Sequence, residues 1–429
     1  MHTVNNFNEL QQAIQDKVKE IVISRSFLCN TSISLPPSVS LLGQAQENGT
    51  LPSLSFVHTD GVGLTQNNTV SNLVIQAPVD KKAIYNTSVV EDLGTFNFNH
   101  LKLTGQFSII TRSGVKKARV NVKDLDIVAA DARHYLEQPQ KYGVNVLQGA
   151  FTVYNFNSDA DSLVELEVDG IRIGRPDAPV VGSGLFVSGF GDEGGKLFAK
   201  SITTDAVYSN GKIPFGVANL ITAGVFVVYG AKVEKLTHNE DIVTYGVNDM
   251  VLDTWGEVDY WLSKKNVISY GPSGVGFVNF GYVKHFEVLG NVETYGLGAR
   301  GYNQYDGTVD NIVFKSIKTF GDGSVGIQIS KKIGQLTVNE DVTTYGGIGN
   351  SLVKGKNVLL PAIALSIKEG GDVESITIGG NVETHGDNVT SYQVDAGIIR
   401  HLTIKGQVKA HGKDSKDIAV INNGQSPLV

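Results

Sequence analysis

The feature that most constrains the fold is a repeated triplet of Thr or Ser, an aromatic residue and Gly. Five copies place the aromatic residue at positions 245, 270, 295, 320 and 345, so each copy lies 25 residues after the one before it. Two further copies, at residues 384–386 and 410–412, have His in the aromatic position, and the last begins with Ala. Repeats of about 20 to 50 residues are typical of chains that stack one short structural unit on the next. We therefore expect a solenoid, in which each repeat buries its inner face only against its neighbours.

A period of 25 residues fits two solenoid architectures. A leucine-rich repeat needs a recurrent Leu-x-x-Leu-x-Leu frame, which these repeats lack. Residues 325–345 instead consist of three short alternating segments separated by turn residues, as in one coil of a parallel β-helix. The 49 Gly residues are spread along the chain, which favours many tight turns over one flexible linker. The prediction is an all-β chain that forms a parallel β-helix with coils of about 25 residues.

The predicted domain organisation is a single β-helix over residues 1–429. Residues 1–45 are expected to form an N-terminal cap and the first coil. The cap would be a short helix that buries Phe7, Leu10 and Ile14 and begins at Asn6 or Asn8. The remaining segments are coils over 46–345 with surface loops near 131–145 and 205–222, a loop insertion over 346–361, and last coils with a C-terminal cap over 362–429. Insertions in a solenoid become surface loops, which often wall a groove or contact another subunit.

The N-terminal segments resemble those of the pectin-lyase-like β-helix superfamily. The candidate helix is followed by an Ile-x-Ile strand at residues 21–23 and by LPPSVSL at residues 35–41. Gly63-Leu64 and then TVSNLVI at residues 69–75 continue the likeness. The resemblance implies right-handed coils over most of the chain and side-by-side homotrimers. It does not select a function, because this fold carries lyases, hydrolases, transglycosylases, epimerases, tailspikes and non-enzymatic adhesins.

Composition and charge argue against several classes of partner. The formal net charge is -7 and no basic stripe is present, so we expect no nucleic-acid partner. No segment approaches the roughly 20 apolar residues of a membrane span, and the N-terminus lacks the features of a signal peptide. The expected protein is soluble and cytoplasmic. The nine His residues form no local metal-binding motif, so we expect no metal and no cofactor.

The 25-residue period places side chains in columns along the coils, because equivalent residues stack about 4.8 Å apart. Alternation predicts that one column points inward and that two columns point outward, one polar and one aromatic. An aromatic row beside a polar row suits sugars, which stack on rings and hydrogen-bond to carboxylates and amides. A shift of the register by one residue would instead bury the aromatic row in the core. The inward column is Leu252, Phe277, Tyr302 and Ile327; the outward columns are Asp253, Val278, Asn303 and Gln328, and Trp255, Phe280, Tyr305 and Ser330.

Two carboxylates near the outward columns are candidates for acid–base chemistry. Asp253 and Asp306 are separated by about two coils, roughly 10 Å, near the upper end of the ~6.5–9.5 Å found between the carboxyl groups of inverting glycosidases. One would protonate the leaving oxygen and the other would activate water. The alternative is that Asp306-Gly307 is a turn and Asp249 a turn cap. Arg300, in a column that is otherwise apolar, would either face solvent at the start of a strand or form a structural ion pair with a carboxylate. It could also bind an acidic sugar.

The leading hypothesis is a carbohydrate-active enzyme, glycoside hydrolase-like or polysaccharide lyase-like, that acts on an oligosaccharide or polysaccharide in a lateral groove. The reaction would be hydrolysis, elimination or transglycosylation. The alternative is a non-catalytic β-helix that binds a ligand or serves in assembly, and the sequence leaves open whether the chain is an enzyme. The candidate catalytic residues are Asp253 and Asp306, and the candidate substrate-binding residues are Asp249, Trp255, Arg300, Asn303, Tyr305 and Gln328.

Overall fold

A computed structural model describes residues 1–353 and 356–428. The described chain is almost entirely β-strand, and its strands form long parallel sheets typical of a parallel β-solenoid. It contains two compact units. Unit 1 comprises Met1–Glu137, Gln148–Tyr208 and Val228–Glu234, and unit 2 comprises Gln138–Leu147, Ser209–Val227 and Lys235–Val429.

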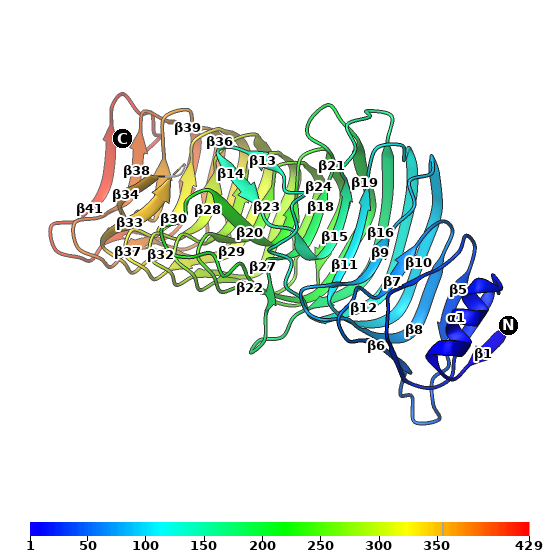
Figure 1. The fold of residues 1–429 in the computed structure, drawn as a ribbon. Helices are drawn as coiled ribbons and strands as arrows, with labels where there is room; N and C mark the ends of the chain where they lie inside the picture. The colour runs from blue at the N-terminus through cyan, green and yellow to red at the C-terminus, as the bar shows by residue number, and fades with distance from the viewer. Residues whose placement is uncertain (354–355, 429) are drawn as a thin grey trace. The chain divides into compact units, whose positions relative to one another are not determined.

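Near its N-terminus, unit 1 contains the helix α1 (Phe7–Gln15), as the sequence predicts (Figure 1). Its N-cap is Asn6, whose side chain accepts a hydrogen bond from the backbone N–H of Glu9. The Glu9 carboxylate in turn accepts from the backbone N–H of Asn5, one residue before the cap. Phe7 and Leu10 are buried as expected, but Ala13 is the third buried residue and Ile14 is only half-buried. The prediction for Ile14 was wrong because the buried stripe of this helix runs through positions 7, 10 and 13.

The wider parallel sheet of unit 1 pairs strands that follow one another along the chain, and it includes the short strands predicted near residues 20 and 40. Strand β17 (Val180–Val181) forms an isolated bridge with Asp131, and β19 and β21 (Ala231–His238) have residues in both units. The strands of the wider sheet are β1 (His2–Val4), β2 (Glu20–Ile23), β3 (Phe27–Cys29), β5 (Ser40–Gly43), β6 (Ser53–Phe56), β8 (Thr69–Gln76), β10 (Asp92–Thr104), β12 (Lys117–Ala129), β16 (Leu163–Ile173) and β19 (Lys196–Asn210).

A second parallel sheet completes unit 1. The core of the unit contains stacked rings from successive strands of this sheet, such as Phe107 on Phe151 with their centroids 4.8 Å apart. The strands are β4 (Ile33–Ser34), β7 (Val62–Leu64), β9 (Lys82–Asn86), β11 (Gln106–Thr111), β15 (Gly149–Asn155) and β18 (Ser183–Ser188).

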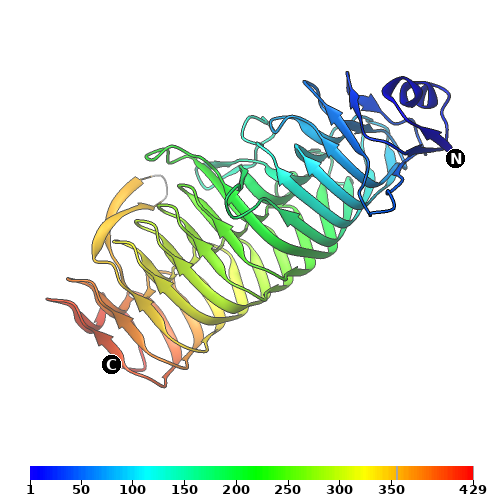
Figure 2. The ribbon, with the colours of Figure 1, turned by 90° about the horizontal axis from the view of Figure 1, so that it is seen from below.

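Unit 2 has the same kind of wider parallel sheet (Figure 2). Its strands are β22 (Ile242–Thr244), β24 (Glu257–Ser263), β25 (Val267–Ser269), β27 (Tyr282–Thr294), β29 (Thr308–Thr319), β31 (Lys332–Val338), β32 (Val342–Thr344), β36 (Asp372–Ile378), β37 (Val382–Thr384), β39 (Ile398–Ile404) and β40 (Val408–Ala410).

The second sheet of unit 2 carries the predicted columns. Leu252 pairs with Phe277, Phe277 with Tyr302 and Tyr302 with Ile327, and all four are fully buried. The strands are β14 (Val144–Val146), β20 (Leu220–Val227), β23 (Asp249–Thr254), β26 (Val275–Asn279), β28 (Arg300–Gln304), β30 (Val325–Ile329), β35 (Leu365–Ile367), β38 (Thr390–Asp395) and β41 (Lys416–Ile421).

The repeated triplet has a physical explanation in unit 2. The aromatic residues stack in a ladder, and Tyr295, Phe320 and Tyr345 have centroids 4.6 and 5.0 Å apart and nearly parallel planes. From Gly271 onward, the Gly that follows each ring lies close to the backbone carbonyl of the equivalent Gly in the preceding repeat. A Cβ on Gly296 would lie 1.9 Å from the carbonyl oxygen of Gly271, which no side chain tolerates. Because adjacent rings cover one another's faces, the ladder presents mainly ring edges to solvent.

The insertion expected over 346–361 contains an antiparallel hairpin of β33 (Ile348–Val353) and β34 (Lys356–Pro361); residues 354 and 355 lie outside the described part, as does residue 429 of the expected C-terminal cap. Figure 2 shows this hairpin projecting from the stacked strands of unit 2. A second hairpin pairs β13 (Gln140–Lys141) with β14. No helix of the described residues has the length and apolarity needed to cross a membrane.

Candidate functional site

A cavity of about 360 Å³ lies in unit 2 beside strands β23, β26 and β28. Its volume is in the range of about 300–1,000 Å³ that is usual for small-molecule sites. Seven of its fifteen lining residues were singled out by the sequence as members of the outward columns or as candidate site residues. These residues are Asp253, Val278, Trp255, Phe280, Tyr305, Arg300 and Asp306.

The floor of the cavity follows from strand alternation. Asp253 and Val278 are paired neighbours that line the cavity, while the preceding residues, Leu252 and Phe277, pack in the core. At the start of the same strands a second set of paired residues, Met250, Val275 and Arg300, also lines the cavity.

Glycines at the next position explain how this second set reaches the cavity. A Cβ on Gly276 or Gly301 would lie within 2.5 Å of a core side chain, Val292 or Ile317, so these positions face the interior. Val275 and Arg300 directly precede these inward-facing glycines, so strand alternation directs their side chains away from the interior and to the cavity.

Aromatic side chains form one wall. Phe280 and Tyr305 stack with their centroids 5.1 Å apart and their planes 3° from parallel, and Trp255 meets Phe280 edge to face at 6.0 Å. Tyr142 adds a fourth ring, 4.5 Å from Phe280 and 5.4 Å from Trp255. Trp255 is 4% exposed, so it is buried beneath the neighbouring rings. Among the described residues, Tyr305 has one stacked aromatic neighbour, Phe280, and it lines the cavity.

The cover of the cavity comes from segments that the sequence predicted as loops. Tyr142 and Val144 belong to the β13–β14 hairpin, and Ala218 and Ile221 lie at and before the start of β20. The hairpin turn consists of Tyr142 and Gly143, both with positive φ (56° and 83°), as a tight two-residue turn requires. A non-glycine residue in this region is strained, and strain of this kind is concentrated at functional sites.

Asp253 is the most unusual group in the cavity. It is fully buried, and neither carboxylate oxygen has a hydrogen-bond partner among the described residues. Burial raises the pKa of Asp253 well above its ordinary value, because the charged form loses its hydration. The folded protein therefore favours the neutral, protonated form of the Asp253 carboxyl group.

Arg300 is the complementary group. Its side chain is 1% exposed, and Nη1 donates to the carbonyl oxygen of Gly298 at 3.4 Å. Nε and Nη2 have no partner in the described chain, and no ion pair to a carboxylate is formed there. Neither structural expectation for Arg300, a solvent-facing residue or a structural ion pair, describes this buried guanidinium. Burial lowers the pKa of Arg300, but a guanidinium stays protonated in proteins.

Asp306 also lines the cavity, but its side chain is partly exposed. Its carboxylate accepts a hydrogen bond from the Tyr142 hydroxyl at 3.3 Å and lies 3.5 Å from Lys331 Nζ. Asp306 and Gly307 also form the turn between β28 and β29, so the turn and a place in the cavity are compatible.

Three of the candidate substrate-binding residues lie outside the lining. Asp249 is buried and accepts hydrogen bonds from the backbone of Gly211 and Gly246 and from the Thr222 hydroxyl. Burial raises its pKa to about 6 against the opposing effect of these three bonds. Asn303 and Gln328 are buried neighbours in the second sheet, and their amide groups approach to 3.5 Å.

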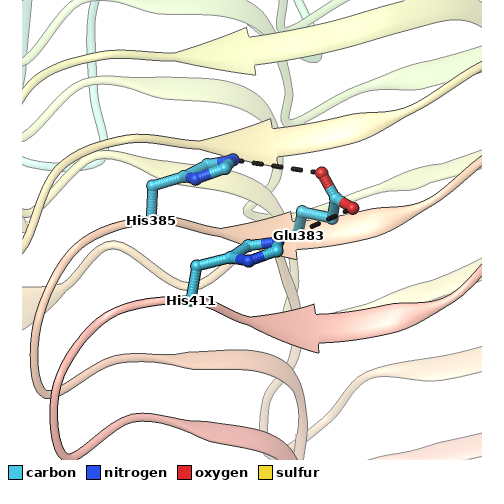
Figure 3. A group of neighbouring side chains, drawn as sticks. All are labelled: Glu383, His385 and His411. Atoms are coloured by element: carbon cyan, nitrogen blue, oxygen red, sulfur yellow. Dashed lines mark ion pairs between the residues drawn. The ribbon is translucent and has the colours of Figure 1, made fainter.

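A separate cluster that the sequence analysis did not identify lies near the end of unit 2. Glu383, His385 and His411 offer one ligand atom each within 4.8 Å of one another (Figure 3). The signal was present in the repeat, because both His residues occupy the ladder position of the triplet. Local spacing rules for metal motifs overlook donors that come together through stacked coils.

Comparison with known proteins assigns neither site to a family. The chain was compared with protein-family models, with curated proteins and with solved structures, and none of the three comparisons finds a match. The function is therefore argued from the chemistry of the sites themselves.

Proposed function

We propose that this protein is a right-handed parallel β-helix that hydrolyses a glycan containing an acidic sugar in the cavity of unit 2. The 25-residue spacing of paired residues in β23, β26, β28 and β30 supports coils of that length. Right-handed crossovers are the rule where parallel strands of one sheet are connected. The observation that carries the functional proposal is that two buried groups, Asp253 and Arg300, line one cavity and each retains polar atoms without a partner in the described chain.

Recognition of the acidic sugar would fall to Arg300. A buried cation without a counter-ion is costly, and a ligand carboxylate that pairs with it removes that cost. The two partnerless nitrogens, Nε and Nη2, lie on one side of the guanidinium, so they match the two oxygens of a carboxylate. The ring of Tyr305, which lines the same cavity, then suits the apolar face of a sugar ring.

Cleavage would use the two carboxyl groups in different roles. Asp253, kept neutral by burial, donates its proton to the glycosidic oxygen as the bond from that oxygen to the anomeric carbon breaks. Asp306, the more exposed group, takes a proton from the water whose oxygen bonds to the anomeric carbon. The products are two shorter sugars, one with a new reducing end. The proton gained by Asp306 returns to Asp253 through solvent.

The second candidate is binding without cleavage, and one observation favours it. The Asp306 carboxylate already contacts Tyr142 and Lys331, so a water molecule competes with two protein groups for its oxygens. A site of this kind would hold an acidic glycan and release it unchanged.

The test is a panel of oligosaccharides in matched acidic and neutral forms, with binding measured by calorimetry and products by mass spectrometry. Hydrolysis predicts binding of acidic members and fragments that have gained one water. Fragments with an unsaturated sugar would show that the reaction is elimination instead of hydrolysis. Transfer products would show that it is transglycosylation. Saturable binding without any product would contradict hydrolysis and support the second candidate function, binding without cleavage. Binding of neither form would contradict both.

A further inference from the structure

The residues Glu383, His385 and His411 form a second site, which is independent of the cavity. His385 directly follows β37 and His411 directly follows β40, and these strands are paired through Val382–Val408 and Thr384–Ala410. The imidazole rings are stacked with their centroids 4.6 Å apart and their planes 7° from parallel. Tyr345 stacks on the other side of His385 at 4.8 Å. The ladder thus holds two imidazoles side by side with the same orientation.

Glu383 reaches both rings from the side. Figure 3 shows its carboxylate beside the ring nitrogens of the two His residues. One oxygen lies 3.9 Å from Nε2 of His385 and the other lies 3.7 Å from Nε2 of His411. The same geometry occurs earlier in the ladder, where Glu293, two residues before Tyr295, accepts a hydrogen bond from the Tyr295 hydroxyl at 2.7 Å. A Glu two positions before the ladder residue therefore reaches the tip of its ring.

The distances are too long for hydrogen bonds but suit a shared ion. Hydrogen bonds between N and O measure about 2.7–3.2 Å. Two ligand atoms that are each about 2.1 Å from one Zn²⁺ lie about 3.4 Å apart in a tetrahedron and about 4.2 Å apart when opposed. The two separations from Glu383, 3.9 and 3.7 Å, lie between these values, and the three ligand atoms lie within 4.8 Å of one another. Tetrahedral binding therefore requires side-chain rotations that draw the three groups closer together.

The charges around the cluster leave Glu383 available. Lys409 is the cross-strand neighbour of Glu383, and a lysine there would be its natural partner. Lys409 Nζ instead lies 3.4 Å from Asp417, whose other oxygen accepts a hydrogen bond from the backbone N–H of Ala410. Asp417 therefore neutralises the lysine that would otherwise compete with a metal ion.

We propose that Glu383, His385 and His411 bind a divalent transition-metal ion of the Zn²⁺ class. Two imidazoles and one carboxylate are ligands that Zn²⁺ accepts, and three protein ligands leave one position open for water or another ligand. Both rings are partly exposed, with 36% and 43% of their side chains accessible, so the ion would reach the site from solvent. The ion would tie the coil of β37 to the coil of β40.

The test is titration of the purified protein with Zn²⁺ at neutral pH by calorimetry, and with Co²⁺ by visible absorption. We expect one ion per chain and the absorption bands of tetrahedral Co²⁺. His411→Phe keeps a stacked ring, as Phe320 does in the same ladder, and Glu383→Gln keeps the side-chain shape. Each should weaken binding by at least about tenfold, the scale on which altered groups around a metal reduce affinity.

The matched control is His285→Phe. His285 is stacked on Tyr260 and lies 3.6 Å from Glu287, two residues away, but it offers only one imidazole with one carboxylate. This variant should bind Zn²⁺ as the wild type does. Absence of saturable binding by the wild type, or equal affinity in His411→Phe and Glu383→Gln, would overturn the proposal.

Discussion

Asp253 and Arg300 line the same cavity, yet each retains side-chain polar atoms that have no partner in the described chain. They do not lie opposite each other in the sheet: Asp253 pairs with Val278 and Arg300 pairs with Val275, so they differ by two strands and three positions. A protein that buried the two groups only for stability would have paired them or replaced them by apolar residues. This arrangement suits a binding site in which the ligand supplies a hydrogen-bond partner to Asp253 and another to Arg300.

Asp253→Asn is expected to increase stability at neutral pH. The raised pKa means that the unfolded chain loses the Asp253 proton near pH 4, while the folded chain keeps it to a higher pH. The contribution of this group to folding is therefore most favourable below pH 4 and falls as the pH rises. Denaturant unfolding at pH 4 and pH 7 should give a gain for the variant of about 1–3 kcal/mol at pH 7 and little at pH 4. Asp310→Asn, which removes an exposed carboxylate outside the cavity, is the control; a loss of stability specific to Asp253→Asn would mean that the carboxylate has a partner.

Arg300→Gln should remove the preference for acidic sugars. A charge-assisted hydrogen bond contributes about 1.5–3 kcal/mol, so affinity for an acidic oligosaccharide should fall by about 10- to 100-fold. Affinity for the matched neutral sugar should change little, since the aromatic wall is retained. Calorimetry with both sugars checks this, and an equal loss for both would show that the variant has disturbed the cavity as a whole.

His238 should limit stability in acid. Its Nε2 accepts a hydrogen bond from Trp261 Nε1 at 2.9 Å, which requires the neutral imidazole, and burial lowers the pKa of His238 to about 3. Because the unfolded chain protonates this group near pH 6.5, its contribution to stability is fully present above that pH and is lost as the pH falls towards 3. The loss amounts to several kcal/mol, at about 1.4 kcal/mol per unit of pKa shift.

The measurement for His238 is the unfolding free energy from pH 7 to pH 4. His238→Gln retains an acceptor for Trp261 and should flatten the decline, whereas the exposed His401→Gln should leave it unchanged. A decline of equal slope in all three proteins would assign the acid sensitivity to other groups.

Gly296→Ala tests the explanation of the triplet. The added Cβ would lie 1.9 Å from the carbonyl oxygen of Gly271, so the coils must move apart. Overpacking of this kind costs about 1–3 kcal/mol. The control is Gly347→Ala, whose Cβ meets no atom closer than 3.6 Å. Thermal unfolding should place Gly296→Ala well below the control, and equal melting temperatures would contradict the backbone contact.

The periodic part of this structure was predictable and the cavity only partly so. The columns of Leu252 and Asp253 follow from a period of 25 residues and from alternation within one strand, which are local rules. The cover of the site depends on Tyr142, which is 164 residues from its partner Asp306. No pattern within a strand relates two such segments. The sequence predicted loops in this region, but not which side chain would enter the aromatic row.

The two charged residues illustrate the same limit. Arg300 was recognisable as an exception in an apolar column. Its burial, with two nitrogens that lack partners in the described chain, depends on the inward position of the neighbouring Gly301 and on the segments that cover the cavity. His385 and His411 were visible as members of the ladder. Their contact with Glu383 could be predicted only by combining the repeat with a second observation. That observation is that Glu293, two residues before Tyr295, reaches the tip of the Tyr295 ring.

The most direct test of the proposed site is the rate of reducing-end release from the best-bound acidic oligosaccharide, measured for the wild type and for Asp253→Asn. Loss of a general acid typically lowers a rate by about 10²- to 10⁴-fold. We predict a decrease of that size in Asp253→Asn, with binding of the oligosaccharide kept within a few-fold and the protein still folded. Turnover by Asp253→Asn at the wild-type rate, or binding by the wild type without release of any reducing end, would contradict the hydrolytic role of this cavity.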